Sequence, residues 1–476
     1  MKTLIKKIFF ILFFFGFVTF SNAQYFINQF DGIPIIIGAP DDISIPEYEK
    51  MEEMGANFVI TNDLTQIRLN EIKHLNFKVI PAQGVNLFYN YVMKYTEGAY
   101  TKWEAEGTPL GKGDATIEYN QDVCTTFVEG SREGIKTLPG AGYDTLIRGP
   151  GYAQERRYWR IDTGYVDYNA EFNLMLSTII PEGGSPNDTI CILQVTDSEI
   201  VGPPSKPYRD STIFIRDTVL LRSDFTPGVW QPFNLIYNFR DEESDGQQPS
   251  NQLPNYTYQN YQSNDPVNKN HADFVQYKII WKGDLYTRLY VDNIIVSDNK
   301  GWQIINDLDI KNLILTQATQ SFYTNDLDNY VAAWFAIDEP ETIDNYEPIR
   351  IVDSLLKDAS DGKRGLWVSF PSSWNGKYGD SHLGAQPLFK SKEFLLRTGL
   401  SPHQNNHPLY HYPFTPENIN NYHPGDDYRD WNIKYLADTI MNRVNDWDPN
   451  FSITLICGKY VGAYLEHDPL PHEMLY

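Results

Sequence analysis

The sequence predicts an α/β fold: a (β/α)8-type barrel that is interrupted after its third strand by an antiparallel β-sandwich. Two observations predict it. On both sides of a central region, short apolar runs alternate with amphipathic helical stretches, a pattern typical of parallel strands joined by helical crossovers. Inside the central region, over 95–303, helical periodicity disappears and a period of two replaces it, as in antiparallel strands with one buried side.

The first 23 residues predict a secretory leader. A segment with three lysines precedes an apolar run from Ile8 to Phe20, and small residues follow it as far as Ala23. This order is typical of a cleaved signal peptide. The run has about 13 residues, fewer than the roughly 20 that a membrane-spanning helix needs. We therefore expect cleavage after Ala23 and a mature protein without a membrane span that is secreted, periplasmic or held at the cell surface.

The first part of the barrel is expected over 24–94. Each apolar run is short enough for a buried strand, and each helical stretch repeats its apolar residues at intervals of three. Gly55 ends the first helical stretch, as glycine commonly does. Strands are expected over 33–37, 57–61 and 77–81, with helices over 46–55 and 69–75.

The inserted sandwich is expected over 95–303. Apolar residues alternate over 172–176, 233–239 and 285–291, and turn-rich or polar stretches separate these runs. Such runs each have one apolar side, and packing two sheets face to face buries it.

The second part of the barrel is expected over 304–476, with strands over 331–337, 366–370, 408–412 and 451–457 and helices over 349–356 and 433–444. The two parts supply seven strands, one fewer than a closed barrel needs. The chain stops at Tyr476, where a last helix would begin. We therefore expect an incomplete barrel and a sequence that is a fragment of a longer chain.

Composition and net charge limit the classes of partner that we expect the protein to bind. The net charge of −23 argues against nucleic acid and anionic membranes, which leaves neutral ligands open. Aromatic residues make up 14% of the chain; they suit the faces of sugars and equally the cores of β-sheets.

Metal sites are not expected from the cysteines or histidines. The three cysteines are scattered, and a single bridge between Cys124 and Cys191 is favoured because both lie in the central region. His403, His407 and His411 repeat every four residues, but prolines around them exclude the helix that would bring them together.

The end of the fourth barrel strand carries two adjacent acids, Asp338 and Glu339. Function gathers at the carboxyl ends of barrel strands, and a half-buried carboxyl beside another can donate a proton near neutral pH. Acids followed by Pro340 also make a good helix start. The residues alone leave both interpretations open.

The segment Asp338-Glu339-Pro340 resembles the Asn-Glu-Pro or Asp-Glu-Pro signature of glycoside hydrolases built on the β/α barrel. In that family the Glu after strand four is the general acid/base. Tyr412-Pro413 is similar to the Tyr-Pro that closes strand six, and Pro471-His472-Glu473 to the Pro-x-Glu before the final helix. The resemblance covers about 33–86 and 305–476 and implies that Glu339 protonates a glycosidic oxygen.

The partner carboxylate departs from the family's pattern. The resemblance implies a nucleophilic Glu at the end of strand seven, but that strand ends at Cys457-Gly458 without an acid. Glu466, in the following loop, and Asp338 are the candidates. Where similar enzymes have an Asn that binds the neighbouring sugar hydroxyl, this chain has Asp338. Retention and inversion both stay open.

Other strand ends offer substrate-binding residues. Asp41 follows strand one and Gln83 follows strand three, while Trp374 and Tyr412 carry rings that could stack on a sugar. Each can equally be a loop or wall residue.

The insert has its own resemblance. Gly228-Val229-Trp230-Gln231 and the run from Tyr290 to Val296 look like strands of jelly-roll carbohydrate-binding modules. Trp230, Trp281 and Tyr286 could form an aromatic platform or belong to the core. Asp292 could hold a structural calcium, as similar modules often do. No other cofactor is expected.

These observations lead to two hypotheses. The first is a secreted glycoside hydrolase, or a close relative, that acts on an oligo- or polysaccharide with Glu339 as general acid/base. The alternative is a non-catalytic carbohydrate-binding or surface-scaffold protein with a decayed site, which the missing acid on strand seven favours. A barrel hydrolase acting on another substrate is a third possibility, because fold does not determine function.

Overall fold

The structure is a computed structural model, and it describes fifteen segments of the chain. These are residues 36–38, 44–61, 64–82, 93–110, 117–149, 167–177, 184–201, 208–237, 275–283, 286–325, 327–336, 345–368, 397–398, 406–411 and 452–457. The expected leader, the loop over 241–270 and the expected helix over 433–444 lie outside them. In the segments described, no helix is long and apolar enough to cross a membrane.

Three short parallel strands pair in chain order near the start of the chain. They are β1 (Ile36–Gly38), β2 (Phe58–Thr61) and β3 (Lys78–Pro81), connected by α2 (Ile45–Glu53) and α3 (Gln66–Ile72). The branched side chains Val59 and Val79 are buried within them, as β-branched residues in two-sided sheets commonly are.

The parallel strands continue after the insert. A bridge pairs Val79 of β3 with Val331, and Ala332 N–H donates to the Val79 carbonyl at 2.9 Å. Farther on, β16 (Trp334–Phe335) pairs in parallel with β17 (Leu366–Trp367), and the helix α9 (Tyr346–Ala359) lies between them in the chain. The strands β18 (Asn406–His411) and β19 (Ser452–Cys457) form another parallel pair. The residues described here do not form a closed barrel, so the barrel stays a prediction.

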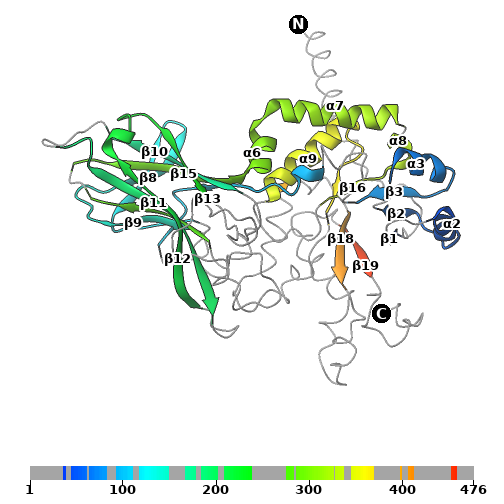
Figure 1. The fold of residues 1–476 in the computed structure, drawn as a ribbon, viewed down its shortest axis with the longest axis horizontal. Coiled ribbons are helices and arrows are strands. Elements are labelled where there is room, and N and C mark those ends of the chain that lie inside the picture. Colours follow the sequence, from blue (N-terminus) through cyan, green and yellow to red (C-terminus); the bar gives the residue numbers. More distant parts are fainter. Residues whose placement is uncertain are drawn as a thin grey trace, which may run out of the picture.

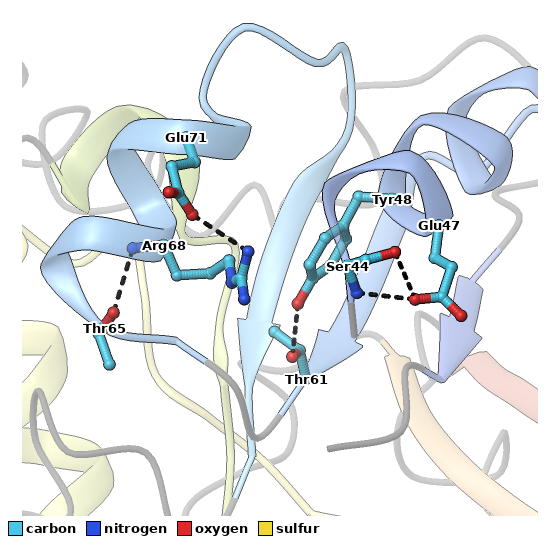
Figure 2. Close-up of polar contacts among 7 residues, drawn as sticks. All are labelled: Ser44, Glu47, Tyr48, Thr61, Thr65, Arg68 and Glu71. Carbon is cyan, nitrogen blue, oxygen red and sulfur yellow. Dashed lines mark hydrogen bonds and ion pairs between the residues drawn. The ribbon is translucent and has the colours of Figure 1, made fainter. Parts of the chain in front are cut away.

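Local hydrogen bonds start the first two helices. Glu47 accepts from both the backbone N–H and the hydroxyl of Ser44 at 2.7 Å, and these bonds lower the pKa of the Glu47 carboxyl. Thr65 accepts from Arg68 N–H at 3.1 Å in the same way. Figure 2 shows both caps beside the buried hydrogen bond, 2.8 Å long, that joins the Tyr48 and Thr61 hydroxyls and ties α2 to the end of β2.

Between β3 and β16 the chain forms two six-stranded sheets, antiparallel except where β5 pairs with β6. The first sheet has the order β13-β10-β15-β8-β7, with β4 also beside β15. Its strands are β4 (Tyr100–Glu104), β7 (Cys124–Glu129), β8 (Arg132–Thr137), β10 (Tyr168–Leu176), β13 (Gln231–Tyr237) and β15 (Leu289–Asp298).

The second sheet has the order β12-β11-β14-β9-β6-β5. Its strands are β5 (Thr108–Pro109), β6 (Glu118–Tyr119), β9 (Asp144–Gly149), β11 (Thr189–Val201), β12 (Tyr208–Leu221) and β14 (Gln276–Trp281). The two sheets pack on each other: Tyr237 and Tyr277 share a hydrogen bond of 2.5 Å between their hydroxyls, and Trp103 lies 5.6 Å from the Tyr277 ring.

Three helices follow the last strand of the sandwich and return the chain to Val331. They are α6 (Asn299–Asn306), α7 (Leu308–Thr324) and α8 (Leu327–Tyr330). Asp307 starts α7 by accepting from the backbone N–H groups of Asp309 and Ile310. The sequence analysis did not predict α7, which buries only Ile314, Ala318 and Phe322. Figure 1 shows the sandwich at one end of the molecule and the parallel strands at the other, with α6 and α9 between them.

A tight seam joins the two regions where the chain enters and leaves the sandwich. A Cβ on Gly301 would lie 1.9 Å from the Ala99 carbonyl oxygen, so only glycine fits there. Asp298 accepts from Gly301 N–H at 2.6 Å, and the Asn345 amide at the start of α9 donates to the Gly98 carbonyl at 3.2 Å. The chain that enters the sandwich therefore packs directly against the chain that leaves it, and the Asn345 side chain at the start of α9 bonds to the entering segment.

The expected bridge between Cys124 and Cys191 is wrong, because both are buried free thiols. Cys124 lies on β7 of the first sheet and Cys191 on β11 of the second. Facing sheets are about 10 Å apart, beyond the roughly 5.5 Å between Cα atoms that a disulfide spans. Burial raises the pKa of the Cys124 thiol to about 12, and it raises the pKa of Cys191 as well.

Candidate functional site

The outer face of the first sheet is the best-formed candidate site in the described chain. Along β10 the residues Phe172 and Leu174 point into the sandwich and are fully buried. Their neighbours Asn169, Glu171 and Asn173 alternate with them and are only half-buried. Because successive side chains of a strand point to opposite faces, these three polar residues lie together on the outside.

Neighbouring strands extend this polar surface. Asn234 of β13 lies opposite Glu171 in the antiparallel register, and Asn293, which is itself buried, lies on the other side, on β15. The Asn173 amide donates to Asn293 Oδ1 at 2.7 Å and to Glu171 Oε1 at 3.2 Å, and the Asn169 amide donates to Asn234 Oδ1 at 2.7 Å. We call the surface formed by Asn169, Glu171, Asn173, Asn234 and Asn293 the amide face.

Three aromatic residues border the amide face where β15 begins. Trp230 stacks on Phe127 with 6.1 Å between ring centroids, and Tyr290 meets both rings edge-on, at 5.3 Å from Phe127 and 6.5 Å from Trp230. Tyr290 pairs across the sheet with Met175, two residues from Asn173. We call Phe127, Trp230 and Tyr290 the aromatic cluster.

Two cations pack on the aromatic cluster, and each has a carboxylate partner. The Arg132 guanidinium lies 4.9 Å from the Trp230 ring centre and pairs with Asp292 at 2.8 Å. Lys136 lies 5.7 Å from the Tyr290 ring centre and 4.0 Å from Glu129. Such contacts orient the rings, so the cluster is held in place before any ligand arrives.

Toward the other end of β15, β4 completes the outer face. Lys102 and Glu104 form an ion pair of 2.6 Å, and Tyr100 lies opposite Ser297 of β15. Burial raises the pKa of the Tyr100 phenol, and the negative charges of Glu171 and of Glu347 on α9 raise it further. The phenol therefore stays protonated and can donate a hydrogen bond.

Together these residues offer a mixed chemistry. Asparagine amides both donate and accept hydrogen bonds, carboxylates accept them, and aromatic rings present flat apolar surfaces. A ligand that carries many hydroxyl groups on an apolar ring matches this set.

The outer face contains residues that the sequence analysis did not select. Of this surface, only Trp230, Asp292 and the run from Tyr290 to Val296 were named there. The alternation of Asn169, Glu171 and Asn173 with apolar residues was a usable signal, because it places three hydrogen-bonding side chains on one side of a strand. Nothing local in the sequence pointed to Phe127 or Arg132.

The three aromatic residues of the insert that were left open between a platform and the core divide between exposed and buried positions. Trp281 is 1% exposed and donates its indole N–H to the Ala141 carbonyl at 3.0 Å, so it belongs to the core. Tyr286 is 60% exposed, and Trp230 is half-buried in the aromatic cluster. Trp281 is buried because the alternation of side chains along β14 places it on the inner side of the strand, the same side as Ile279.

The proposed calcium ligand has a different partner. Asp292 accepts from the Arg132 guanidinium at 2.8 Å. Across the segments that the structure describes, no group of three His, Cys, Asp or Glu side chains is arranged to hold a metal ion. The calcium site stays an untested prediction.

The residues predicted at the ends of the barrel strands lie outside the described residues. This applies to both catalytic candidates and to all five substrate-binding candidates: Glu339, Glu466, Asp338, Asp41, Gln83, Trp374 and Tyr412. The structure therefore describes the strand that leads to Glu339 but not its carboxyl group. That strand remains paired as far as Ala336, whose N–H donates to the Trp367 carbonyl at 3.1 Å.

No protein-family model and no curated protein matches the chain. Three of the solved structures that it resembles have names related to carbohydrate. A Bacteroides thetaiotaomicron protein assigned provisionally to sugar binding is 7% identical, with a TM-score of 0.24, and the match covers 41% of this chain and 95% of that one. The xylan-binding module CBM15 is 12% identical, with a TM-score of 0.17 and coverage of 43% and 93%.

The third structure contains the CBM22-1 and GH10 modules of endo-1,4-beta-D-xylanase 10B from Clostridium thermocellum, complexed with xylohexaose. It is 9% identical, with a TM-score of 0.21, and the match covers 76% of this chain and 90% of that one. All of these TM-scores lie far below 0.5, so the likenesses assign neither a fold nor a ligand to this chain.

Proposed function

We propose that this protein binds carbohydrate, and that a glycan lies on the outer face of the first sheet of the sandwich. The observation that carries this proposal is the amide face next to the aromatic cluster. Hydrogen-bonding side chains that are fixed by one another, beside a half-buried ring, suit a ligand that has hydroxyl groups around an apolar ring. The amide hydrogen bonds of 2.7 Å hold the side chains in place, which lowers the entropy lost on binding.

Removing the central amide tests this proposal. Asn173→Ala deletes the donor to both Asn293 and Glu171, so we expect a loss of affinity of about fivefold or more for whichever oligosaccharide the wild type binds, since an unpaired polar group costs about 1–3 kcal/mol. Calorimetric titration measures the affinity. Asn76→Ala is the matched control, because Asn76 bonds Glu52 in the parallel region. Equal affinity in all three proteins would contradict the proposal.

A second function has its own support. The chain order of β1, β2, β3, β16 and β17, each parallel to its neighbour or bridged to it, suits the first five strands of the proposed barrel. Asp338 and Glu339 follow β16 directly. On this basis we propose that the parallel region hydrolyses a glycosidic bond, with Glu339 as general acid/base and a second carboxylate that either attacks the sugar or activates water.

One pair of measurements separates the two functions. If the hydrolase proposal holds, Glu339→Gln lowers the release of reducing sugar by about 10²- to 10⁴-fold and leaves binding at the sandwich unchanged. Binding to a glycan without any product in the wild type would leave carbohydrate binding in place and exclude hydrolysis of that glycan. Unchanged product release in Glu339→Gln would contradict the assigned role.

A further inference from the structure

The charges on the outer face are unevenly matched. Arg132 pairs with Asp292, Lys136 with Glu129, and Lys102 with Glu104, so each of these cations has a carboxylate within 4.0 Å. Glu171 lies at the centre of the amide face, between Asn234 on β13 and Ile295 on β15. None of the ion pairs found among the described residues includes it. Within the described segments, a hydrogen bond to its carboxylate comes from a neutral amide donor, Asn173.

The negative charge of Glu171 also affects a residue on another strand of the outer face. After burial, the charge of Glu171 is the largest influence that raises the pKa of the Tyr100 phenol, two strands away, and Glu347 at the start of α9 acts in the same direction. Because the three ion pairs of the outer face are each neutral, Glu171 leaves this group of described residues with one more negative charge than positive. A bound neutral sugar experiences little effect from this extra charge, whereas a carboxylate or sulfate on the sugar is repelled.

We propose that the amide face selects uncharged glycans over acidic ones, and that Glu171 is the residue that determines this specificity. The inference rests on the proposed carbohydrate binding and adds the ligand's chemical class. Two like charges a few ångströms apart at a protein surface repel by an amount that corresponds to about a tenfold difference in affinity. Salt screens charges that are exposed to solvent, so the difference narrows at high ionic strength.

The test uses pairs of oligosaccharides that share one backbone and differ by a single uronic acid or sulfate group. A glycan array finds the pairs that the full chain binds, and calorimetric titration measures both members of a pair in 0.05 M and 1 M NaCl. We expect the neutral member to bind about tenfold more tightly in low salt, with the difference reduced in high salt. Equal or tighter binding of the acidic member would overturn the proposed selectivity and leave carbohydrate binding intact.

The variant Glu171→Gln tests whether Glu171 is the residue that determines the preference for uncharged glycans. Glutamine keeps the oxygen that accepts from Asn173 and removes only the charge, so the variant should fold, and the quantity compared is the ratio of its affinities for the two members of a pair. Its preference should fall about threefold or more toward equal binding. Glu53→Gln is the control, because it removes one charge from an exposed position on α2 and should keep the wild-type preference. An unchanged preference in Glu171→Gln would overturn the role of Glu171, and failure of every glycan to bind would overturn the proposed function itself.

Discussion

The sandwich and the parallel region place their candidate residues in different ways. In the sandwich the polar side chains lie on the strands themselves, as Asn169, Glu171 and Asn173 do on β10, so alternation determines their direction. In the parallel region several candidates follow strands of only two to four residues, such as β1, β3 and β16. Their direction depends on loops. The direction of a side chain on a strand can therefore be predicted from the local sequence pattern, whereas the direction of a side chain that follows the end of a strand cannot.

The largest expected effect tests how far the sandwich is a unit of its own. Trp281→Ala removes a fully buried side chain and leaves the Ala141 carbonyl without its donor, so we expect a loss of about 3–5 kcal/mol in the free energy of unfolding. Urea unfolding followed by circular dichroism measures it. Tyr286→Ala, at a side chain that is 60% exposed, is the control and should cost less than about 1 kcal/mol.

The same unfolding measurement also tests whether the sandwich and the parallel region unfold together. If the two regions are coupled through Gly98 and Gly301, Trp281→Ala should shift the whole transition. A transition that splits in two would show instead that the sandwich unfolds separately, and a single free energy would then have no meaning.

The matching change in the parallel region is expected to be somewhat smaller. Asp353 on α9 is buried, accepts from the Leu366 N–H of β17 at 2.9 Å and pairs with Lys357 at 2.5 Å. Asp353→Ala leaves both partners without this carboxylate, and we expect a loss of about 2–3 kcal/mol. Arg350→Ala breaks only an exposed ion pair with Glu347 and should cost less than about 1 kcal/mol. Equal losses in the two variants would show that the buried carboxylate does not stabilise the joint between α9 and β17.

The smallest expected effect concerns a carboxylate that destabilises the folded protein. Burial raises the pKa of Glu106, and the charges of Glu104, Glu133 and Asp292 raise it further. Because the folded pKa lies above the unfolded value, ionisation of Glu106 weakens the fold as the pH rises through that folded pKa. Glu106→Gln should therefore increase stability at pH 7, by up to about 0.5 kcal/mol.

The gain from Glu106→Gln should vanish below the unfolded pKa of about 4.3, where Glu106 is neutral in both states. Thermal unfolding at pH 7 and at pH 3.5 measures both values. A gain that is the same at both pH values would show that charge is not the cause.

Several elements follow directly from local sequence. The apolar runs over 57–61 and 77–81 correspond to β2 and β3, and the helical spacing over 349–356 lies within α9. The alternation of Phe172, Leu174 and Leu176 gives the inner side of β10. These features depend on residues a few positions apart, whose side chains share a face whatever the rest of the chain does.

Other features needed residues from distant parts of the chain. From the sequence, Cys124 was paired with Cys191 and Trp281 was left open between a surface platform and the core, because the sequence does not say which sheet or which side each residue occupies. The helix α7 was missed although its buried residues Ile314, Ala318 and Phe322 recur every four residues, a spacing that places them on one face of a helix. The acids near the strand ends, Glu339 above all, remain predictions for the experiments above.

What the sequence alone determined is therefore the local alternation: which stretches are strands or helices, and which side chains of β10 share a side. The tertiary structure decided which strands are neighbours. Asn173 meets Asn293 across 120 residues and Arg132 meets Asp292 across 160, because burying apolar surface between two sheets selects the pairing of whole strands. A carbohydrate-binding face of the proposed kind exists only once those distant strands lie side by side.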